Sequence, residues 1–144
     1  MYSKKYIPNS LSAKDKKKQK KFLNHSVKKY KNKKYFIRPK LQSYKSKKSR
    51  WLSKAQKLYN IKNLTPNKIL STKTKCSIKG LKEIIKKGIG AYYSSGSRPN
   101  QTPQSWGIAR LGSAICGGPA SKVDYHILKK YCKPNSKALK LANL

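Results

Sequence analysis

The side chains best suited to covalent or acid–base chemistry are few in this chain, and they lie far apart in the sequence. There are three acids, two histidines and three cysteines among 144 residues. Cys116 with His126 could serve as a nucleophile and its base, and with Cys132 the pair could bind zinc. However, we expect Cys116 at a helix C-terminus, where the helix dipole disfavours a thiolate, and the spacings match no standard zinc site. We therefore expect a non-enzymatic protein with no catalytic residue, no metal and no cofactor.

The cysteines Cys76, Cys116 and Cys132 are odd in number and widely spaced, and they include no CxxC pair. This pattern predicts neither a disulfide framework nor a zinc ribbon. We interpret all three as small, buried apolar residues in a reducing compartment.

A second possible site is the loop GIGAYYSSGSRPNQT, residues 88–102. Turns rich in glycine and hydroxyl groups can present consecutive backbone N–H groups to an anion, and Arg98 could complete such a site, with Arg110 reaching the same anion. The loop residues concerned are Ser94, Ser95, Gly96, Ser97 and Asn100. The P-loop spacing GxxxxGK[ST] is absent. We favour the alternative of a self-bonded structural loop, in which Arg98 caps carbonyls. Arg110 could reach the same anion as Arg98 or could instead pair with Asp124 or Glu83.

Charge is the strongest signal, because 37 Lys and Arg residues face three acids and give a net charge of +34. This balance predicts nucleic acid or another anionic surface as the partner. Lys is a mobile point charge, so its predominance indicates phosphate neutralisation more than base reading. The predicted nucleic-acid- or anion-binding residues are Lys16, Lys17, Lys18, Lys20, Lys21, Lys28, Lys29, Lys33, Lys34, Lys47, Lys48, Arg98 and Arg110.

The elements that carry these residues divide into three segments. Residues 1–50 are predicted to be a basic arm with interleaved aromatics, extended or disordered because like charges repel. Residues 12–23 could become helical on binding, with Ser12 as the N-cap and Asp15 at the third helical position. Residues 51–134 are predicted to form a small helical domain with the Gly/Ser-rich loop, and residues 135–144 a tail.

Within this domain, apolar periodicity and capping signals predict four to five short helices. The predicted core residues are Trp51, Leu58, Leu81, Ile84, Trp106, Leu111, Ile127 and Leu128. Two short helices around the TKTKCS turn resemble a helix-turn-helix pair, whose basic outer face we expect to contact phosphates only. The last helix is predicted to begin at Ser121 with Asp124 as its cap and to stop at Pro134. The fold class is thus mainly α.

Targeting signals and membrane segments are not expected. The N-terminus MYSKKYIPNS lacks the apolar stretch of a signal peptide, and no apolar run reaches the ~18 residues of a membrane span. We also find no pattern typical of a small-molecule substrate site.

A family resemblance adds a biological setting. The stretch KTKCSIKGLKEIIKKGIGAYYSSGSRPNQTPQSWGIARLGSAICGGPASKVDYHIL resembles an uncharacterised lysine-rich domain of large (nucleocytoplasmic) DNA viruses that also occurs in some tailed phages. The resemblance implies a viral protein carried in the virion and made inside the infected cell, in its cytoplasm or nucleus. Our leading hypothesis is a structural virion protein that binds the viral nucleic acid. The alternative is a minor capsid or assembly protein whose arm threads between acidic capsid surfaces.

Overall fold

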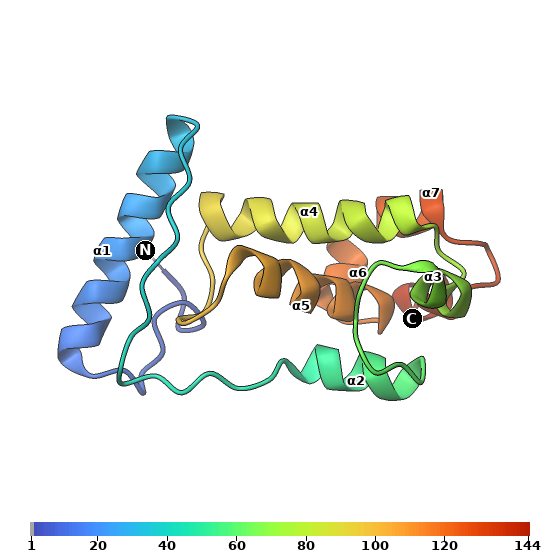
Figure 1. Ribbon diagram of the computed structural model, residues 1–144, viewed down its shortest axis with the longest axis horizontal. Helices are drawn as coiled ribbons and strands as arrows, with labels where there is room; N and C mark the ends of the chain where they lie inside the picture. Colours follow the sequence, from blue (N-terminus) through green and yellow to red (C-terminus); the bar gives the residue numbers. More distant parts are fainter. Residues whose placement is uncertain (1) are drawn as a thin grey trace. The chain divides into compact units, whose positions relative to one another are not determined.

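The computed structural model describes residues 2–144, and these residues form a mainly helical structure, as predicted (Figure 1). The helices are α1 (Ala13–Lys31), α2 (Arg50–Leu58), α3 (Lys68–Thr74), α4 (Ile78–Ser94), α5 (Pro103–Ile115), α6 (Pro119–Val123), α7 (Tyr125–Tyr131) and α8 (Lys137–Ala142).

The chain folds into two compact units whose limits differ from the predicted segments. The first unit contains the residues up to Lys47 and Ile89–Trp106, and the second contains Lys48–Gly88 and Gly107–Leu144. The stretch 88–102, which was predicted to be a loop of the helical domain, is helical up to Ser94 because α4 continues past Gly88, and only the residues after Ser94 form a loop. Residues 89–106 pack with the basic N-terminal segment.

In the first unit, the predicted helix start is confirmed, but the helix is much longer than expected. The Ser12 hydroxyl accepts a hydrogen bond from the Asp15 backbone N–H at 3.1 Å, and α1 then continues for 19 residues. Its inner face buries Asp15, Gln19, Leu23 and Ser26 at spacings of three and four residues, as one side of a helix requires.

The chain after α1 returns along the helix instead of extending away from it (Figure 1). Phe36 packs against Phe22 and His25, and the Ser43 backbone N–H donates to Asp15 at 2.9 Å. The prediction of an extended or disordered arm over residues 1–50 is therefore wrong for this structure. Contacts within the unit hold the basic segment in a folded form, despite the repulsion between its lysines.

The second unit contains most of the predicted core. Leu81, Ile84, Leu111, Ile127 and Leu128 are buried, as expected, and the half-buried side chains of Trp51 and Leu58 pack against them. Trp106 instead belongs to the first unit, where its ring meets that of Tyr6 edge-on at 6.3 Å. The core of this unit is thus built as the periodicity predicted, with one aromatic residue assigned to the wrong place.

Close approach between α4 and α7 depends on Gly80. A Cβ atom at this position would lie 2.3 Å from the Cβ atom of Tyr131, so only glycine fits without a shift of one helix. The same pair of segments carries an unexpected bond between Cys76 and Cys132, which are 56 residues apart and form a disulfide. Ser77 N–H donates to Tyr131 O at 2.9 Å, and Lys133 N–H donates to Lys75 O at 2.9 Å.

The disulfide corrects our interpretation of the cysteines. All three are buried, as predicted, but only Cys116 is a free thiol. The pairing was missed because the short antiparallel contact that brings Cys76 and Cys132 together is a tertiary feature with no local sequence signal.

The C-terminal region also differs from the prediction. The expected single helix is broken at Asp124 into α6 and α7, and the tail forms α8. Ser136 caps α8 by accepting from Leu139 N–H at 3.2 Å, and Ala138, Leu139 and Ala142 are buried in the core. Burial therefore stabilises a helix that would be too short to form alone.

A helix that crosses a membrane needs a continuous apolar stretch of about 18 residues or more. Among the described residues, no helix combines the length and apolar character needed to cross a membrane.

Candidate nucleic-acid interface

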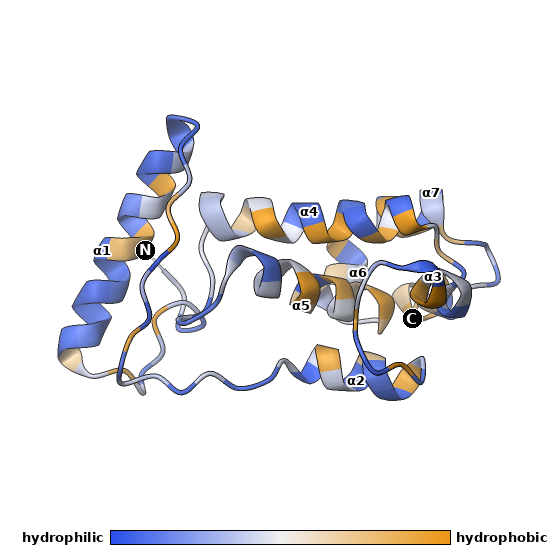
Figure 2. Cartoon of the chain, viewed as in Figure 1, coloured by the Kyte–Doolittle hydropathy of each residue, from blue (hydrophilic) through white to orange (hydrophobic). Residues whose placement is uncertain are grey.

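The outer face of α1 carries an exceptional density of positive charge. Nine of the 19 residues of α1 are lysines, and Figure 2 shows the helix as mostly hydrophilic. Lys14, Lys17, Lys18 and Lys21 are all exposed; the first two and Lys21 lie on the side opposite the buried stripe, and Lys18 lies on its flank. We call these four residues the lysine ridge. Lys20 and Lys31 are also exposed, whereas Lys16 is half-buried at the edge of the helix.

Lys14 was absent from the residues predicted to bind nucleic acid. The helical spacing of three and four residues that joins it to Lys17, Lys18 and Lys21 could have identified it, had α1 been predicted as a stable helix.

The single acid of α1 does not neutralise the ridge. The Asp15 carboxylate accepts hydrogen bonds from the Ser43 hydroxyl at 2.5 Å and from the Ser43 backbone N–H at 2.9 Å. The side-chain bond to Ser43, followed by the backbone bond, lowers the pKa of Asp15 below its ordinary value. The carboxylate is therefore held by Ser43, and it also attracts the nearby Lys18 and Lys14. One acid against nine lysines still leaves the helix strongly positive for an external anion.

A second basic cluster lies where α1 ends. Lys33 adopts a left-handed conformation with φ of 58°, and its backbone N–H donates to Tyr30 O at 2.9 Å. The next residue, Lys34, donates to Lys29 O at 2.9 Å. These two bonds form a Schellman motif, which satisfies the last carbonyls of the helix and turns the chain back along it.

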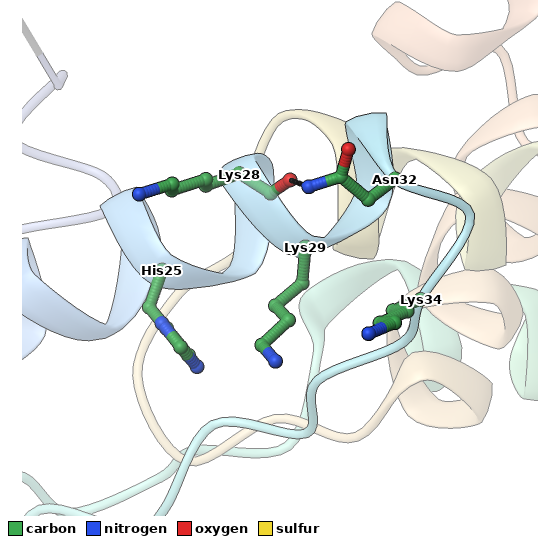
Figure 3. Close-up of a pocket in the computed structure, with 5 residues that line it drawn as sticks. All are labelled: His25, Lys28, Lys29, Asn32 and Lys34. Atoms are coloured by element: carbon green, nitrogen blue, oxygen red, sulfur yellow. Dashed lines mark hydrogen bonds between the residues drawn. The ribbon is translucent and has the colours of Figure 1, made fainter.

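This turn creates a basic pocket. The pocket has a volume of about 260 Å³ and is lined by His25, Lys28, Lys29, Asn32 and Lys34 (Figure 3). Figure 3 shows the side chains of His25 and Lys29 projecting from the same side of α1, with Lys34 on the returning chain. No acid lines the pocket, so the cluster favours an anionic ligand. The structure thus brings together three of the predicted lysines with a histidine and an amide that sequence reasoning had not assigned.

Two further predicted lysines, Lys47 and Lys48, are exposed and lie outside both of these clusters. Lys47 ends the first unit, and Lys48 begins the second, where its ammonium donates to Gln56 Oε1 at 2.6 Å. Neither residue belongs to the ridge or to the pocket.

A buried arginine, Arg38, connects α1 to the loop and was not predicted to have any role. Its side chain is 6% exposed and donates to Ser26 Oγ at 2.8 Å, to Tyr92 O at 2.8 Å and to Ser97 Oγ at 2.7 Å. The guanidinium carbon also lies 3.7 Å from the centre of the Tyr92 ring. Burial lowers the pKa of Arg38, but an arginine remains charged at any physiological pH. Arg38 is therefore a structural link that positions the lysine-bearing helix.

The Gly/Ser-rich loop bonds to its own unit. Asn100 accepts from Leu41 N–H at 2.7 Å and donates to the carbonyls of Leu41 and Tyr44 at 3.1 and 2.9 Å. Gly96 has a φ of 131° and packs against Leu23, where a Cβ atom would lie 2.9 Å from a methyl carbon. Ser97 is buried, whereas Ser94 and Ser95 are exposed and near each other. These bonds match the self-bonded loop that we favoured, which holds α1. The predicted role of Arg98 is wrong, because among the described residues its side chain caps no carbonyl.

The two arginines of the predicted anion site have different roles. Arg110 forms a bidentate ion pair with the fully buried Asp124, with its Nε at 2.7 Å from Oδ2 and its Nη2 at 2.8 Å from Oδ1. The hydrogen bond to Asp124 raises the pKa of Arg110. Arg110 is therefore engaged internally and is withdrawn from the anion site, and Asp124 is a salt-bridge partner and not a side-chain helix cap. Arg98 is exposed, and it remains a candidate contact.

The candidate catalytic residues are not arranged for nucleophilic chemistry. Burial raises the pKa of the Cys116 thiol to about 11, which keeps it protonated near neutral pH. Cys132 is bonded to Cys76, and His126 is exposed. In the described part of the chain, no three His, Cys, Asp or Glu side chains are grouped so that they could hold a metal ion.

Comparisons with known proteins identify a family without assigning an activity. A family model described as a family of unknown function (DUF5824) matches residues 3–135. The chain belongs to this family. No curated protein and no solved structure matches the chain.

Proposed function

We propose that this family member is a non-enzymatic protein that binds nucleic acid through its phosphate backbone, with the lysine ridge of α1 as the main contact surface. The observation that carries the proposal is the asymmetry of α1. Its lysines face outward, while its one carboxylate is fixed inward by Ser43. A row of exposed lysines with a single acid near it, on a folded helix, is suited to replacing the counterions that surround a polyanion.

The ridge has dimensions that match a phosphate backbone. Lys14 to Lys21 spans two turns, about 10 Å at 1.5 Å per residue, and duplex phosphates recur about every 3.4 Å along each strand. Several ridge lysines can therefore reach phosphates at once. Because α1 is already folded, binding does not require the ordering of a disordered segment, which would reduce the affinity.

The proposed contact does not depend on base sequence. Lysine contacts to phosphates position a protein on nucleic acid but carry no sequence information. We therefore expect binding to be general and strongly dependent on salt concentration. Packaging or condensation of a viral genome is a role that needs this kind of binding, and the resemblance of the central segment to proteins of large DNA viruses supports a place in the virion.

The competing proposal is a minor capsid or assembly protein with a basic arm between acidic capsid surfaces. That function was suggested by an extended arm, and α1 with its returning chain is folded instead. The nucleic-acid proposal is therefore better supported, and capsid binding becomes an outcome that experiment can reveal.

The test is a salt titration of binding to a fluorescent duplex. The variant Lys14→Gln/Lys17→Gln/Lys18→Gln/Lys21→Gln removes the ridge charge, and glutamine preserves helix propensity. Each lost phosphate contact should reduce the log–log salt slope by about 0.9, so four contacts reduce it by about 3.6. When the salt concentration rises from 50 to 200 mM, the wild type should therefore lose about 150-fold more affinity for the duplex than the ridge variant loses.

The matched control removes the same charge from exposed positions in the second unit. The control variant replaces the lysines at positions Lys129, Lys133, Lys137 and Lys140 by glutamine. We expect the log–log salt slope of this control variant to differ less from the wild-type slope than the slope of the ridge variant does. Equal slopes for the two variants would show that only total charge matters, and salt-insensitive binding by the wild type would refute the proposed function itself.

A further inference from the structure

The basic pocket at the end of α1 lies next to an exposed aromatic residue. Tyr35 follows the pocket residue Lys34 directly and is 69% exposed. Its ring lies 4.9 Å from the ring of Tyr93 and 6.2 Å from that of Tyr30, measured between centroids. A ring that is supported by two others and still largely open to solvent is a preformed surface for another flat group.

From this arrangement we infer that the α1 turn is a binding site for single-stranded nucleic acid. A phosphate of the strand binds among Lys28, Lys29 and Lys34, and a neighbouring base stacks on Tyr35. The inference rests on the proposed function, and it adds that this second site prefers single-stranded nucleic acid to a duplex.

The pocket has a suitable size and chemistry for this ligand. Its volume of about 260 Å³ lies slightly below the ~300 Å³ typical of the smallest drug-sized ligand sites. A phosphate or one nucleotide therefore matches this volume. The ammonium groups supply charge, and the Asn32 and His25 side chains supply hydrogen-bonding groups.

The position of the pocket lining is fixed by the fold. The Schellman bonds of Lys33 and Lys34 hold the turn, and the His25 ring packs edge-on against Phe36 with 4.5 Å between centroids. The lining residues are thus presented by a defined turn and a packed ring, in contrast to independent surface lysines. Preorganisation of this kind lowers the cost of ordering side chains on binding.

An unpaired base is required because Tyr35 offers a ring face. Bases in a duplex are already stacked and expose only their edges, whereas the bases of a single strand can stack on aromatic side chains. Lys34 and Tyr35 are consecutive residues of the chain that follows the turn. A strand whose phosphate binds at Lys34 therefore passes close to the exposed ring of Tyr35.

The experiment compares a labelled single-stranded dT oligonucleotide, the matching oligo-U and a blunt duplex, by fluorescence anisotropy with the full chain. Tyr35→Ala should weaken binding to both single strands about 5-fold or more, and binding to the duplex less than about 2-fold. Tyr35→Phe keeps the ring and should bind like the wild type. A selective loss on one single strand alone would support the site and identify its natural ligand as DNA or RNA.

The lysines of the pocket are tested separately. Lys29→Gln/Lys34→Gln should reduce the single-strand salt slope by about 1.4, and Lys129→Gln/Lys133→Gln is the control of equal charge. Melting curves followed by circular dichroism establish that the variants remain folded.

Two results would overturn the inference. One is that Tyr35→Ala loses affinity for the duplex and for the single strands to the same extent. The other is that neither the tyrosine variant nor the lysine variant loses affinity for any of the three probes. In both cases the wild type still binds the duplex, so the proposed function survives. If the wild type binds no nucleic acid in a salt-dependent manner, the proposed function fails first.

Discussion

Replacing Arg38 by alanine is expected to release α1 from the Gly/Ser-rich loop. The guanidinium makes three side-chain hydrogen bonds, which join Ser26 on α1 to Tyr92 and to Ser97. All of these contacts disappear in the variant, and the Ser26 and Ser97 hydroxyls lose a partner in a buried environment. The helix that carries the lysine ridge would then be held mainly by Leu23, by the hydrogen bonds between Asp15 and Ser43, and by the aromatic contacts with Phe36.

The size of the effect follows from these contacts. A hydrogen bond to a charged group contributes about 1.5–3 kcal/mol, and we use the lower end because removal of a buried charge also relieves its desolvation. Three bonds then amount to about 4.5 kcal/mol. For a chain of this length, that loss corresponds to a fall in melting temperature of roughly 10 °C or more.

The assay is thermal unfolding followed by far-ultraviolet circular dichroism. Arg98→Ala is the matched control, because it removes an exposed arginine of the same unit. We expect Arg98→Ala to change the free energy of unfolding by less than about 0.5 kcal/mol. If Arg38→Ala melts like the wild type with its helix content intact, then Arg38 does not hold α1, and the structural basis for the ridge is wrong.

Three further predictions concern stability. The disulfide joins residues 56 positions apart, so its removal should lower the free energy of unfolding by about 4 kcal/mol. The removal can be made by reduction or by the double variant Cys76→Ser/Cys132→Ser, and chemical unfolding with and without reductant measures the loss. A double variant whose stability still falls on addition of reductant would contradict the prediction. The pKa of Asp15 is lower in the folded state than its value of 3.8 in the unfolded chain, because the folded protein stabilises the carboxylate. This stabilisation is therefore complete above pH 3.8 and disappears as the pH falls through the folded-state pKa. Asp15→Asn should thus be less stable than the wild type at pH 7 and equal to it in strong acid, and a gap that does not change with pH would refute the assignment. Leu111→Ala should cost about 2–5 kcal/mol, measured by denaturant unfolding, and a loss below about 1 kcal/mol would mean that this side chain is not in a packed core.

Much of the second unit could be predicted from the sequence because its signals are local. Leu81, Ile84 and Leu111 recur at helical spacing among polar residues, and Pro103 marks the start of α5. The break at Asp124 could not be predicted in this way. Asp124 is buried at the break in an ion pair with Arg110, and this contact between separate helices leaves no local signal in the sequence.

The first unit shows why a folded basic segment can look like a disordered one. Only Leu23 is a fully buried apolar residue on the inner face of α1, and the rest of that face consists of Asp15, Gln19 and Ser26. Such a stripe has little hydrophobic periodicity. Its partners, Ser43 and the buried Arg38, are polar and lie beyond the end of the helix, so the docking becomes visible only when the chain is folded.

The candidate site could be predicted only in part, because charge is visible in the sequence but the grouping of the charges depends on the fold. The lysines were identified by charge alone, which required no knowledge of the fold. Their division into a ridge and a pocket required the helix, and the pocket also required the left-handed turn at Lys33. Arg110 was misplaced because charge alone does not distinguish an internal ion pair from a free cation.

The most direct test of nucleic-acid binding through α1 is lysine footprinting of the unmodified protein. The rate of acetylation of each lysine is measured by mass spectrometry, with and without a saturating DNA duplex. We predict that Lys14, Lys17 and Lys21 lose most of their reactivity when DNA is bound, while Lys129 and Lys140 react as before. Unchanged reactivity of the ridge lysines, or stronger protection at Lys129 and Lys140, would contradict the proposal.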